Sequence, residues 1–430
     1  MNMIKSFVYG AAFFVLASWG AAHDPDAPLS SSLSSPTPSS HLYSMKVEPD
    51  RLALSRVLCL DGGGVRGAYT AQVLGDFKKE LDDERICDFF QGGITGTSTG
   101  AIIALAVVAP EHRNKITGEM EEGPYPAQEI VSFYEEMADE IFKCWTPANC
   151  WTNTTHGYNE SWAESLKKTL WNMATCFGCC ACFKNCNGFC GPKYSNHSLR
   201  AFLEKHFGDL TLKEALVPVQ IVSYDISRNA PVYFNSYTHP NVKFVDAALC
   251  SSAAPTYFSG VSIEDGDNGP PYQCIDGGIF DNSACLAALR LGLVHWDKIP
   301  TRDPSFKPHM DNFVLLSIGT GERMIGSRYK NLKHAGKLTW ASAAVEISID
   351  GASQATHANL QAIYEATKGE DEIRRYFRIQ TILPDTEAEM DNASIIQQLR
   401  GRAREDTSGG RPNEAFREFV RNHVRSPKTL

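Results

Sequence analysis

Short apolar runs alternate with longer amphipathic runs through most of the chain. The runs 56–61 and 89–96 are apolar and followed or interrupted by glycine, as in buried strands, and helical patterns follow them at 67–81 and 99–109. Further apolar runs lie at 217–225, 243–253, 272–276, 313–321 and 376–383. Apolar strands that alternate with helices predict a mainly parallel central sheet with helices on both faces, an α/β fold.

Three segments depart from this alternation. Residues 111–123 are polar with two glycines and predict a surface loop. Residues 144–195 hold eight of the thirteen cysteines and four of the seven tryptophans, which predicts an insertion in the α/β core. Residues 391–430 predict a charged, solvated helical segment with a loop at Gly409–Pro412.

The N-terminus has the pattern of a targeting sequence. Lys5 precedes an apolar run that ends in small residues, so residues 1–22 are expected to be a secretory signal peptide. The run is short for a membrane span, and a retained anchor is the alternative. The Ser/Pro-rich segment 23–46 predicts a disordered tether before a catalytic domain at 47–390. We expect a secreted protein or one of the endomembrane lumen, with a cytoplasmic or membrane-associated protein as the alternative.

The net charge and the cysteine content limit which binding partners and which cellular compartment are expected. The net charge of −9 and the absence of a long basic run argue against a nucleic-acid partner. The high density of cysteines predicts disulfide bonds if the compartment is oxidising. Because the total of thirteen is odd, at least one cysteine would have no partner for a disulfide bond within the chain. In a reducing compartment, the spacing of Cys176 and Cys179 would instead allow zinc. Four sequons indicate glycosylation at Asn153, Asn159, Asn196 and Asn392.

The first glycine cluster, 61-DGGGVRG-67, lies between a predicted strand and a helix. Its spacing suits a dinucleotide site, but its amides at a helix start also suit an oxyanion hole. A dinucleotide site needs an acidic residue at the end of the next strand. The acidic residues 82–84 lie in a run that ends a helix, which favours the oxyanion hole.

The second glycine cluster, 96-GTSTG-100, has the G-x-S-x-G pattern of a nucleophile elbow, with Ser98 at its centre. A serine nucleophile needs a base. Asp276 ends an apolar run and precedes two glycines, although Asp-Gly is also a hairpin signal. The later histidines do not lie in glycine-rich loops directly after strands: His295, His309, His334 and His357.

Three motifs in this order, DGGGVRG, GTSTG and 276-DGG-278, resemble those of patatin-like phospholipases. The resemblance continues through 251-SSAAPTYF-258, 280-FDNSACLA-287 and 315-LLSIGTG-321, and so covers roughly Arg56 to Leu383. It implies a three-layer α/β/α patatin-like fold that carries the Cys/Trp-rich insertion.

The resemblance also assigns roles to individual residues. Ser98 would be the nucleophile and Asp276 the base of a Ser–Asp dyad. The backbone amides of Gly62, Gly63 and Gly64 would form the oxyanion hole. Arg66 would either fix the glycine loop or meet a lipid headgroup. This chemistry requires no metal and no cofactor.

The implied activity is that of a lipid acyl hydrolase, a phospholipase A-type enzyme that cleaves fatty acyl esters of phospholipids or galactolipids. Its partner would be a membrane or micellar lipid, with peripheral membrane contact. The alternatives are a Ser-His-Asp carboxylesterase and an inactive lipid-binding or storage relative. The insertion would be an aromatic lid on the lipid surface or a disulfide-stapled knob.

Overall fold

The computed structural model describes residues 55–81, 85–114, 117–142, 192–264, 270–295, 312–323, 332–334, 336–367, 375–384, 387–408 and 410–423. All of these residues belong to one compact unit, Val47–Leu430. The predicted signal peptide, the tether and residues 144–191 of the insertion lie outside the described residues.

The described residues contain a central sheet of eight strands, in the order β11-β9-β1-β2-β5-β8-β7 with β6 also paired to β5. Its strands are β1 (Ser55–Leu60), β2 (Gly93–Thr97), β5 (Val219–Asp225), β6 (Ala230–Asn235), β7 (Val261–Ile263), β8 (Tyr272–Asp276), β9 (Phe313–Ile318) and β11 (Tyr376–Ile379). The run from β11 to β5 is parallel, whereas β6, β7 and β8 pair in antiparallel fashion. The prediction of a mainly parallel sheet is confirmed.

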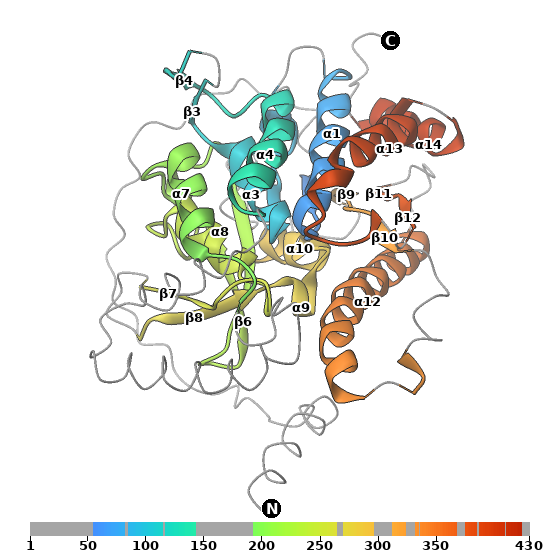
Figure 1. Ribbon diagram of the computed structural model, residues 1–430. Helices are drawn as coiled ribbons and strands as arrows, with labels where there is room; N and C mark the ends of the chain where they lie inside the picture. Colours follow the sequence, from blue (N-terminus) through green and yellow to red (C-terminus); the bar gives the residue numbers. More distant parts are fainter. Residues whose placement is uncertain are drawn as a thin grey trace, which may run out of the picture. The chain divides into compact units, whose positions relative to one another are not determined.

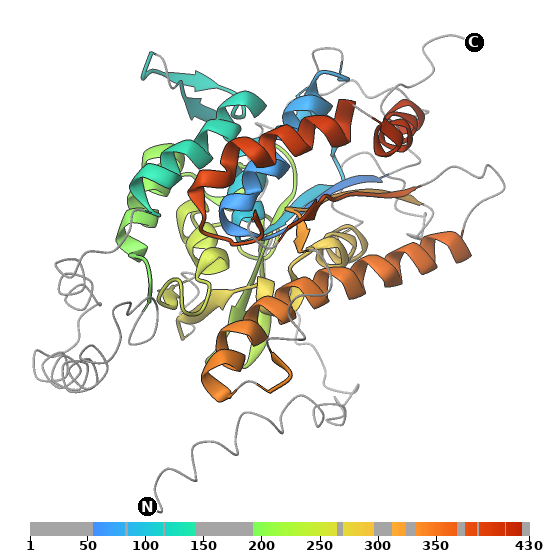
Figure 2. The same ribbon diagram turned by 45° about the vertical axis from the view of Figure 1, so that its right-hand side comes forward.

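Helices cover both faces of this sheet (Figures 1 and 2). One face packs against α1 (Gly67–Lys78), α3 (Thr99–Val108), α4 (Ala127–Glu140), α7 (Asn196–Phe207), α8 (Phe244–Ser252), α13 (Ile396–Ser408) and α14 (Gly410–His423). The other face packs against α9 (Gly278–Asp281), α10 (Cys285–Val294) and α12 (Lys337–Ala366).

Strand β1 shows how one sequence run serves both layers. Leu58 and Leu60 belong to the larger core, whereas Val57 and Cys59 point to the α10 and α12 side. Side chains alternate between the faces of a strand, so an apolar strand between two helical layers must be apolar at every position. This explains the continuous apolar run and confirms the three-layer α/β/α arrangement.

Three expectations about the surface segments are wrong in whole or in part. Residues 111–123 form a short antiparallel hairpin of β3 (Glu111–Arg113) and β4 (Met120–Glu122), so they are not an irregular loop. The C-terminal segment is not simply a solvated helix, because α13 packs along α1 and buries Leu399 in the main core, and α14 buries Phe416 and Phe419 there. The expected loop at Gly409–Pro412 is also wrong in part, since α14 already begins at Gly410.

The cysteines of the described residues are free and buried: Cys59, Cys87, Cys250, Cys274 and Cys285. The other eight lie between Cys144 and Cys190, so the predicted disulfide or zinc cluster falls outside the described residues. Within the described ranges, acidic, histidine and cysteine side chains form no metal-binding cluster. In the same part of the chain, every helix is too short or too polar to cross a bilayer.

Candidate active site

Strand β5 brings two distant parts of the sequence together. Its first residues, 219–222, pair with β2 in parallel, and its last residues, 223–225, pair with β8 in antiparallel fashion. Because β6 pairs with β5 over residues 220–225 and occupies the other edge, β2 and β8 must share one edge of β5. The two strands therefore run toward each other along that edge.

Their carboxyl ends meet at one point. Thr97, the last residue of β2, lies opposite Val222, and Asp276, the last residue of β8, lies opposite the next residue, Ser223. Ser98 follows Thr97 directly. The sheet thus places the two predicted catalytic side chains beside each other although 178 positions separate them in the sequence (276 − 98).

Ser98 occupies a strained turn between β2 and α3, with φ 54° and ψ −121°. Positive φ is unfavourable for a residue with a Cβ atom, and such strain typically amounts to about 1–3 kcal/mol. The N–H of Ser98 donates a hydrogen bond of 2.8 Å to the Ser251 hydroxyl, which itself donates to the carbonyl of Val222 at 2.5 Å. This chain of hydrogen bonds ties the strained turn to β5.

The glycines around Ser98 are required by close backbone contacts. A Cβ atom on Gly96 would lie 2.2 Å from the carbonyl oxygen of Gly100, and one on Gly100 would lie 2.2 Å from that of Leu60. Both distances are far below van der Waals contact. The G-x-S-x-G spacing therefore lets α3 start directly against the sheet, which confirms the predicted elbow geometry.

Asp276 is buried, with 4% of its surface exposed. Its Oδ1 accepts a hydrogen bond of 2.7 Å from the N–H of Gly278. Burial raises the pKa of the Asp276 carboxyl to about 6, and the hydrogen bonds from Gly278 and the Ser98 side chain limit the rise. The carboxylate is thus a stronger base than an exposed aspartate and is in hydrogen-bonding reach of Ser98.

The glycine loop after β1 differs from the prediction in one respect. The N–H of Gly62 donates to the carbonyl of Asn282 at 3.1 Å, so the prediction of Gly62 as an oxyanion donor is wrong. Gly63 and Gly64 line the cavity next to Ser98. Among the described residues, no backbone acceptor is assigned to the N–H of either glycine. These two amides are the donors that an oxyanion hole would use.

Arg66 supports this loop from behind. Only 3% of its surface is exposed, its Nε donates to the carbonyl of Gly63 at 3.4 Å, and its Nη1 donates to the carbonyl of Gly321 at 3.1 Å. Of the two roles predicted for Arg66, the structure supports fixing the loop. Contact with a lipid headgroup is wrong, because the guanidinium is buried and bonded to backbone carbonyls.

A second buried charge fixes the start of the loop. Arg378 on β11 forms two hydrogen bonds with Asp61, of 3.1 and 2.6 Å, and both side chains are buried. Burial raises the pKa of Asp61, and the guanidinium of Arg378 works against this rise. Asp61 opens the first glycine motif, but its partner Arg378 lies 317 positions away, so no local pattern predicts the pair.

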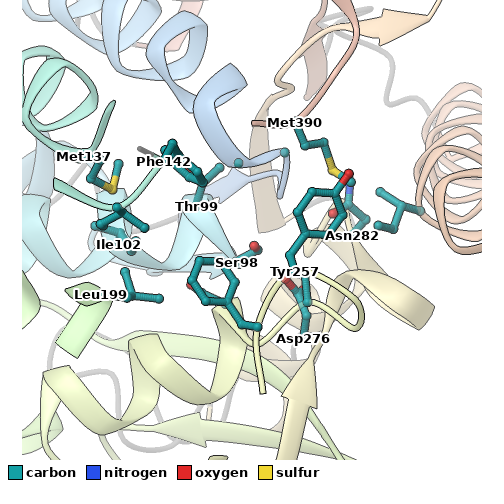
Figure 3. Close-up of a pocket in the computed structure, with 17 residues that line it drawn as sticks. Ser98, Thr99, Ile102, Met137, Phe142, Leu199, Tyr257, Asp276, Asn282 and Met390 are labelled. Atoms are coloured by element: carbon teal, nitrogen blue, oxygen red, sulfur yellow. The ribbon is translucent and has the colours of Figure 1, made fainter. Parts of the chain in front are cut away.

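The cavity beside Ser98 has an apolar and a more polar side (Figure 3). Met137, Phe142, Ile102 and Leu199 gather on one side of Ser98, and the other side carries Tyr257, Asp276, Asn282 and Met390. Ile102 comes from α3, Met137 from α4 and Leu199 from α7. Phe142 follows directly after the end of α4. The geometry suits an apolar chain next to the serine, with the reacting group near Asp276.

The histidines of the described residues do not line this cavity. His357 is hydrogen-bonded to the Tyr376 hydroxyl at 2.8 Å, His295 packs on Tyr237, and His334 is exposed. His309 lies outside the described residues. Within the part of the chain that the structure describes, Asp276 is therefore the one carboxylate that lines the cavity with Ser98.

Fold and site together define a three-layer α/β protein with a serine elbow and a buried acid at the ends of two strands. The family model for patatin-like phospholipase matches residues 58–172 and 185–289, and the chain belongs to this family. Membership supports lipid acyl hydrolase activity.

The relatives are plant proteins of the same family. The chain is 28% identical over 368 residues to patatin-like protein 2 of Arabidopsis thaliana, which covers 80% of this chain and 79% of that protein. It is 28% identical to patatin-like protein 1 of Arabidopsis thaliana, covering 76% and 74% of the two chains. It is 27% identical to patatin-17 of Solanum cardiophyllum, covering 79% of each.

Proposed function

We propose that this protein hydrolyses fatty acyl esters of phospholipids or galactolipids, with Ser98 as nucleophile and Asp276 as base. The observation that carries the proposal is the strained Ser98 beside a buried carboxyl of raised pKa, between the apolar and the more polar side of one cavity. Strain and buried charge both oppose folding, and their coincidence in one cavity is typical of a functional site.

In the first half of the reaction, the Ser98 Oγ attacks the ester carbonyl while Asp276 takes the hydroxyl proton. The N–H groups of Gly63 and Gly64 hold the negative oxygen of the tetrahedral intermediate. As the intermediate collapses, the C–O bond of the ester breaks and the proton passes from Asp276 to the leaving alcohol or lysolipid. Ser98 is left as an acyl ester.

In the second half, water attacks the acyl ester and gives its proton to Asp276. The second tetrahedral intermediate uses the same two amides. When it collapses, the fatty acid leaves and the proton returns from Asp276 to the Ser98 Oγ. No net proton is bound by the enzyme in the complete cycle, so one carboxylate is sufficient as the base.

The cavity lining supports an acyl chain as the bound group. Each methylene moved from water into an apolar site contributes about 0.8 kcal/mol, so a long chain along Ile102, Met137 and Leu199 provides ample binding free energy. On the other side of Ser98, burial keeps the Asp276 carboxylate basic.

The decisive experiment combines active-site labelling with product analysis. A fluorophosphonate probe should label the wild-type protein and fail to label Ser98→Ala. Phospholipid and galactolipid mixtures should yield free fatty acids with the wild type only. Asp276→Asn should lose turnover, whereas His357→Ala and His295→Ala should keep it.

Each alternative has its own outcome in this experiment. Loss of turnover in a histidine variant, with Asp276→Asn still active, would favour a Ser-His-Asp carboxylesterase. A wild-type protein that binds lipid but neither reacts with the probe nor releases fatty acid would be an inactive lipid-binding relative. Either result would contradict the proposed dyad.

A further inference from the structure

The turn 319-GTG-321 directly after β9 lies next to the glycine loop but outside the cavity lining. Thr320 is buried, with 2% of its surface exposed, and its hydroxyl donates a hydrogen bond of 2.8 Å to the carbonyl of Gly62. The same carbonyl accepts a longer hydrogen bond of 3.3 Å from the Asn282 side chain. Two donors thus hold the Gly62 carbonyl, and the shorter of the two bonds comes from Thr320, which does not line the cavity.

This contact sets the direction of the neighbouring amide. A trans peptide is planar, and its C=O and N–H groups point in opposite directions. The peptide bonds of the described residues include no cis bond. With the Gly62 carbonyl directed at the Thr320 hydroxyl, the N–H of Gly63 points away from Thr320, and Gly63 itself lines the cavity.

Such a fixed peptide plane matters because the loop contains three consecutive glycines. Glycine lacks a Cβ atom and reaches more backbone conformations than any other residue, so a glycine run does not fix its own peptide planes. Thr320 packs tightly against this run, since a Cβ atom on Gly63 would lie 2.3 Å from the Thr320 hydroxyl oxygen. An oxyanion donor is effective only when it is oriented before the charge develops.

We propose that Thr320 is a positioning residue whose hydroxyl holds the Gly62–Gly63 peptide so that the Gly63 N–H points at the developing oxyanion. The proposal rests on the proposed acyl hydrolase function. It gives a role to the 315–321 segment, which the sequence analysis noted without assigning one.

The test compares two threonines that make similar hydrogen bonds. Thr320→Val removes the hydroxyl and keeps the shape of the side chain, and Thr320→Ser restores the hydroxyl. Thr70→Val is the matched control, because the Thr70 hydroxyl also donates to a carbonyl at 2.8 Å, that of Gly319 in the same turn. The control leaves the hydrogen bonds of the Gly62 carbonyl in place.

Thr320→Val should lower kcat by about tenfold to a hundredfold, somewhat less than deletion of an oxyanion donor, with KM changed less than about twofold. Thr320→Ser should recover most of the kcat, and Thr70→Val should stay near the wild type. A long-chain trifluoromethyl ketone, which forms a tetrahedral adduct with an active serine, should bind Thr320→Val more weakly by the same factor as kcat/KM falls. If Thr320→Val does not fold, Thr320→Ala must show the same loss.

Equal kcat values for Thr320→Val and Thr70→Val, or no recovery in Thr320→Ser, would overturn the role of Thr320 and leave the proposed function standing. A wild-type protein that forms no ketone adduct and hydrolyses no ester would contradict the proposed function itself. The two failures are therefore distinguishable.

Discussion

Replacing Asp276 by asparagine is expected to make the folded protein more stable at neutral pH while it abolishes turnover. The carboxyl is buried at the end of β8, and burial raises its pKa from 3.8 to about 6. Asparagine has nearly the same shape, carries no charge, and can accept the hydrogen bond that Gly278 now donates to Oδ1. The substitution therefore removes a buried charge without opening a cavity.

The size of the effect follows from the pKa difference. A difference of one pKa unit between the folded and unfolded states corresponds to about 1.4 kcal/mol, so a rise from 3.8 to about 6 corresponds to roughly 3 kcal/mol of lost stability at pH 7. Asp276→Asn should regain up to about this amount. For a protein of ordinary stability, about 5–15 kcal/mol, such a gain is easily measured.

The pH dependence has a definite sign. The folded protein binds the Asp276 proton more tightly than the unfolded chain does. The stability lost by burying the ionised carboxylate therefore reaches its full value as the pH rises beyond the folded pKa of about 6. The loss shrinks as the pH falls through the folded pKa of about 6, and it vanishes below the unfolded pKa of 3.8. The stability advantage of Asp276→Asn should therefore shrink between pH 7 and pH 4 and disappear at lower pH.

Urea unfolding of both proteins, followed by tryptophan fluorescence at several pH values, measures this difference directly. Asp281 is also buried, which raises its pKa to about 6, but it titrates in both proteins and largely cancels. An advantage that is absent at pH 7, or that is equal at pH 4 and pH 7, would refute the reasoning. In the wild type, kcat/KM should rise with pH up to about 6 and then level off, because the base must be ionised.

Two further predictions concern the strained serine and the buried ion pair. Ser98→Gly and Ser98→Ala should both be inactive. In urea unfolding, the free energy of unfolding of Ser98→Gly should exceed that of Ser98→Ala by about 1 kcal/mol, because glycine adopts φ 54° without strain. Higher stability of the alanine variant would show that the turn is unstrained. Arg378→Met should lose about 3–5 kcal/mol of unfolding free energy, since it leaves Asp61 buried and unpaired. The double variant Asp61→Asn/Arg378→Met should recover part of this loss in the same assay, and a double variant less stable than the single one would contradict the explanation.

The local sequence was sufficient to predict the elements that carry the chemistry. The glycines at positions 96 and 100 predict a sharp turn, because only glycine allows the backbone contacts seen between β2 and α3 and between α3 and β1. The apolar runs predict the buried strands, since a strand between two helical layers is apolar on both faces. Ser98 and Asp276 were therefore recognisable before their arrangement was known.

Other features depend on contacts between distant segments, which no local pattern records. The hydrogen-bond partner of the Gly62 N–H is the carbonyl of residue 282, and this contact removes Gly62 from the predicted oxyanion hole. The loop is held by Thr320, which lies 258 positions away from Gly62. The C-terminal segment looked solvated because most of its residues are polar or charged, yet its few apolar residues recur at helical spacing and pack into the core.

The sequence by itself determined which side chains can react and which turns can form, because these depend on residue type and short spacing. Only the tertiary structure decided that Ser98 and Asp276 meet, since this requires β2 and β8 to share one edge of β5. It also decided the basicity of Asp276, because the pKa of a carboxyl depends on how completely the folded chain removes water from around it.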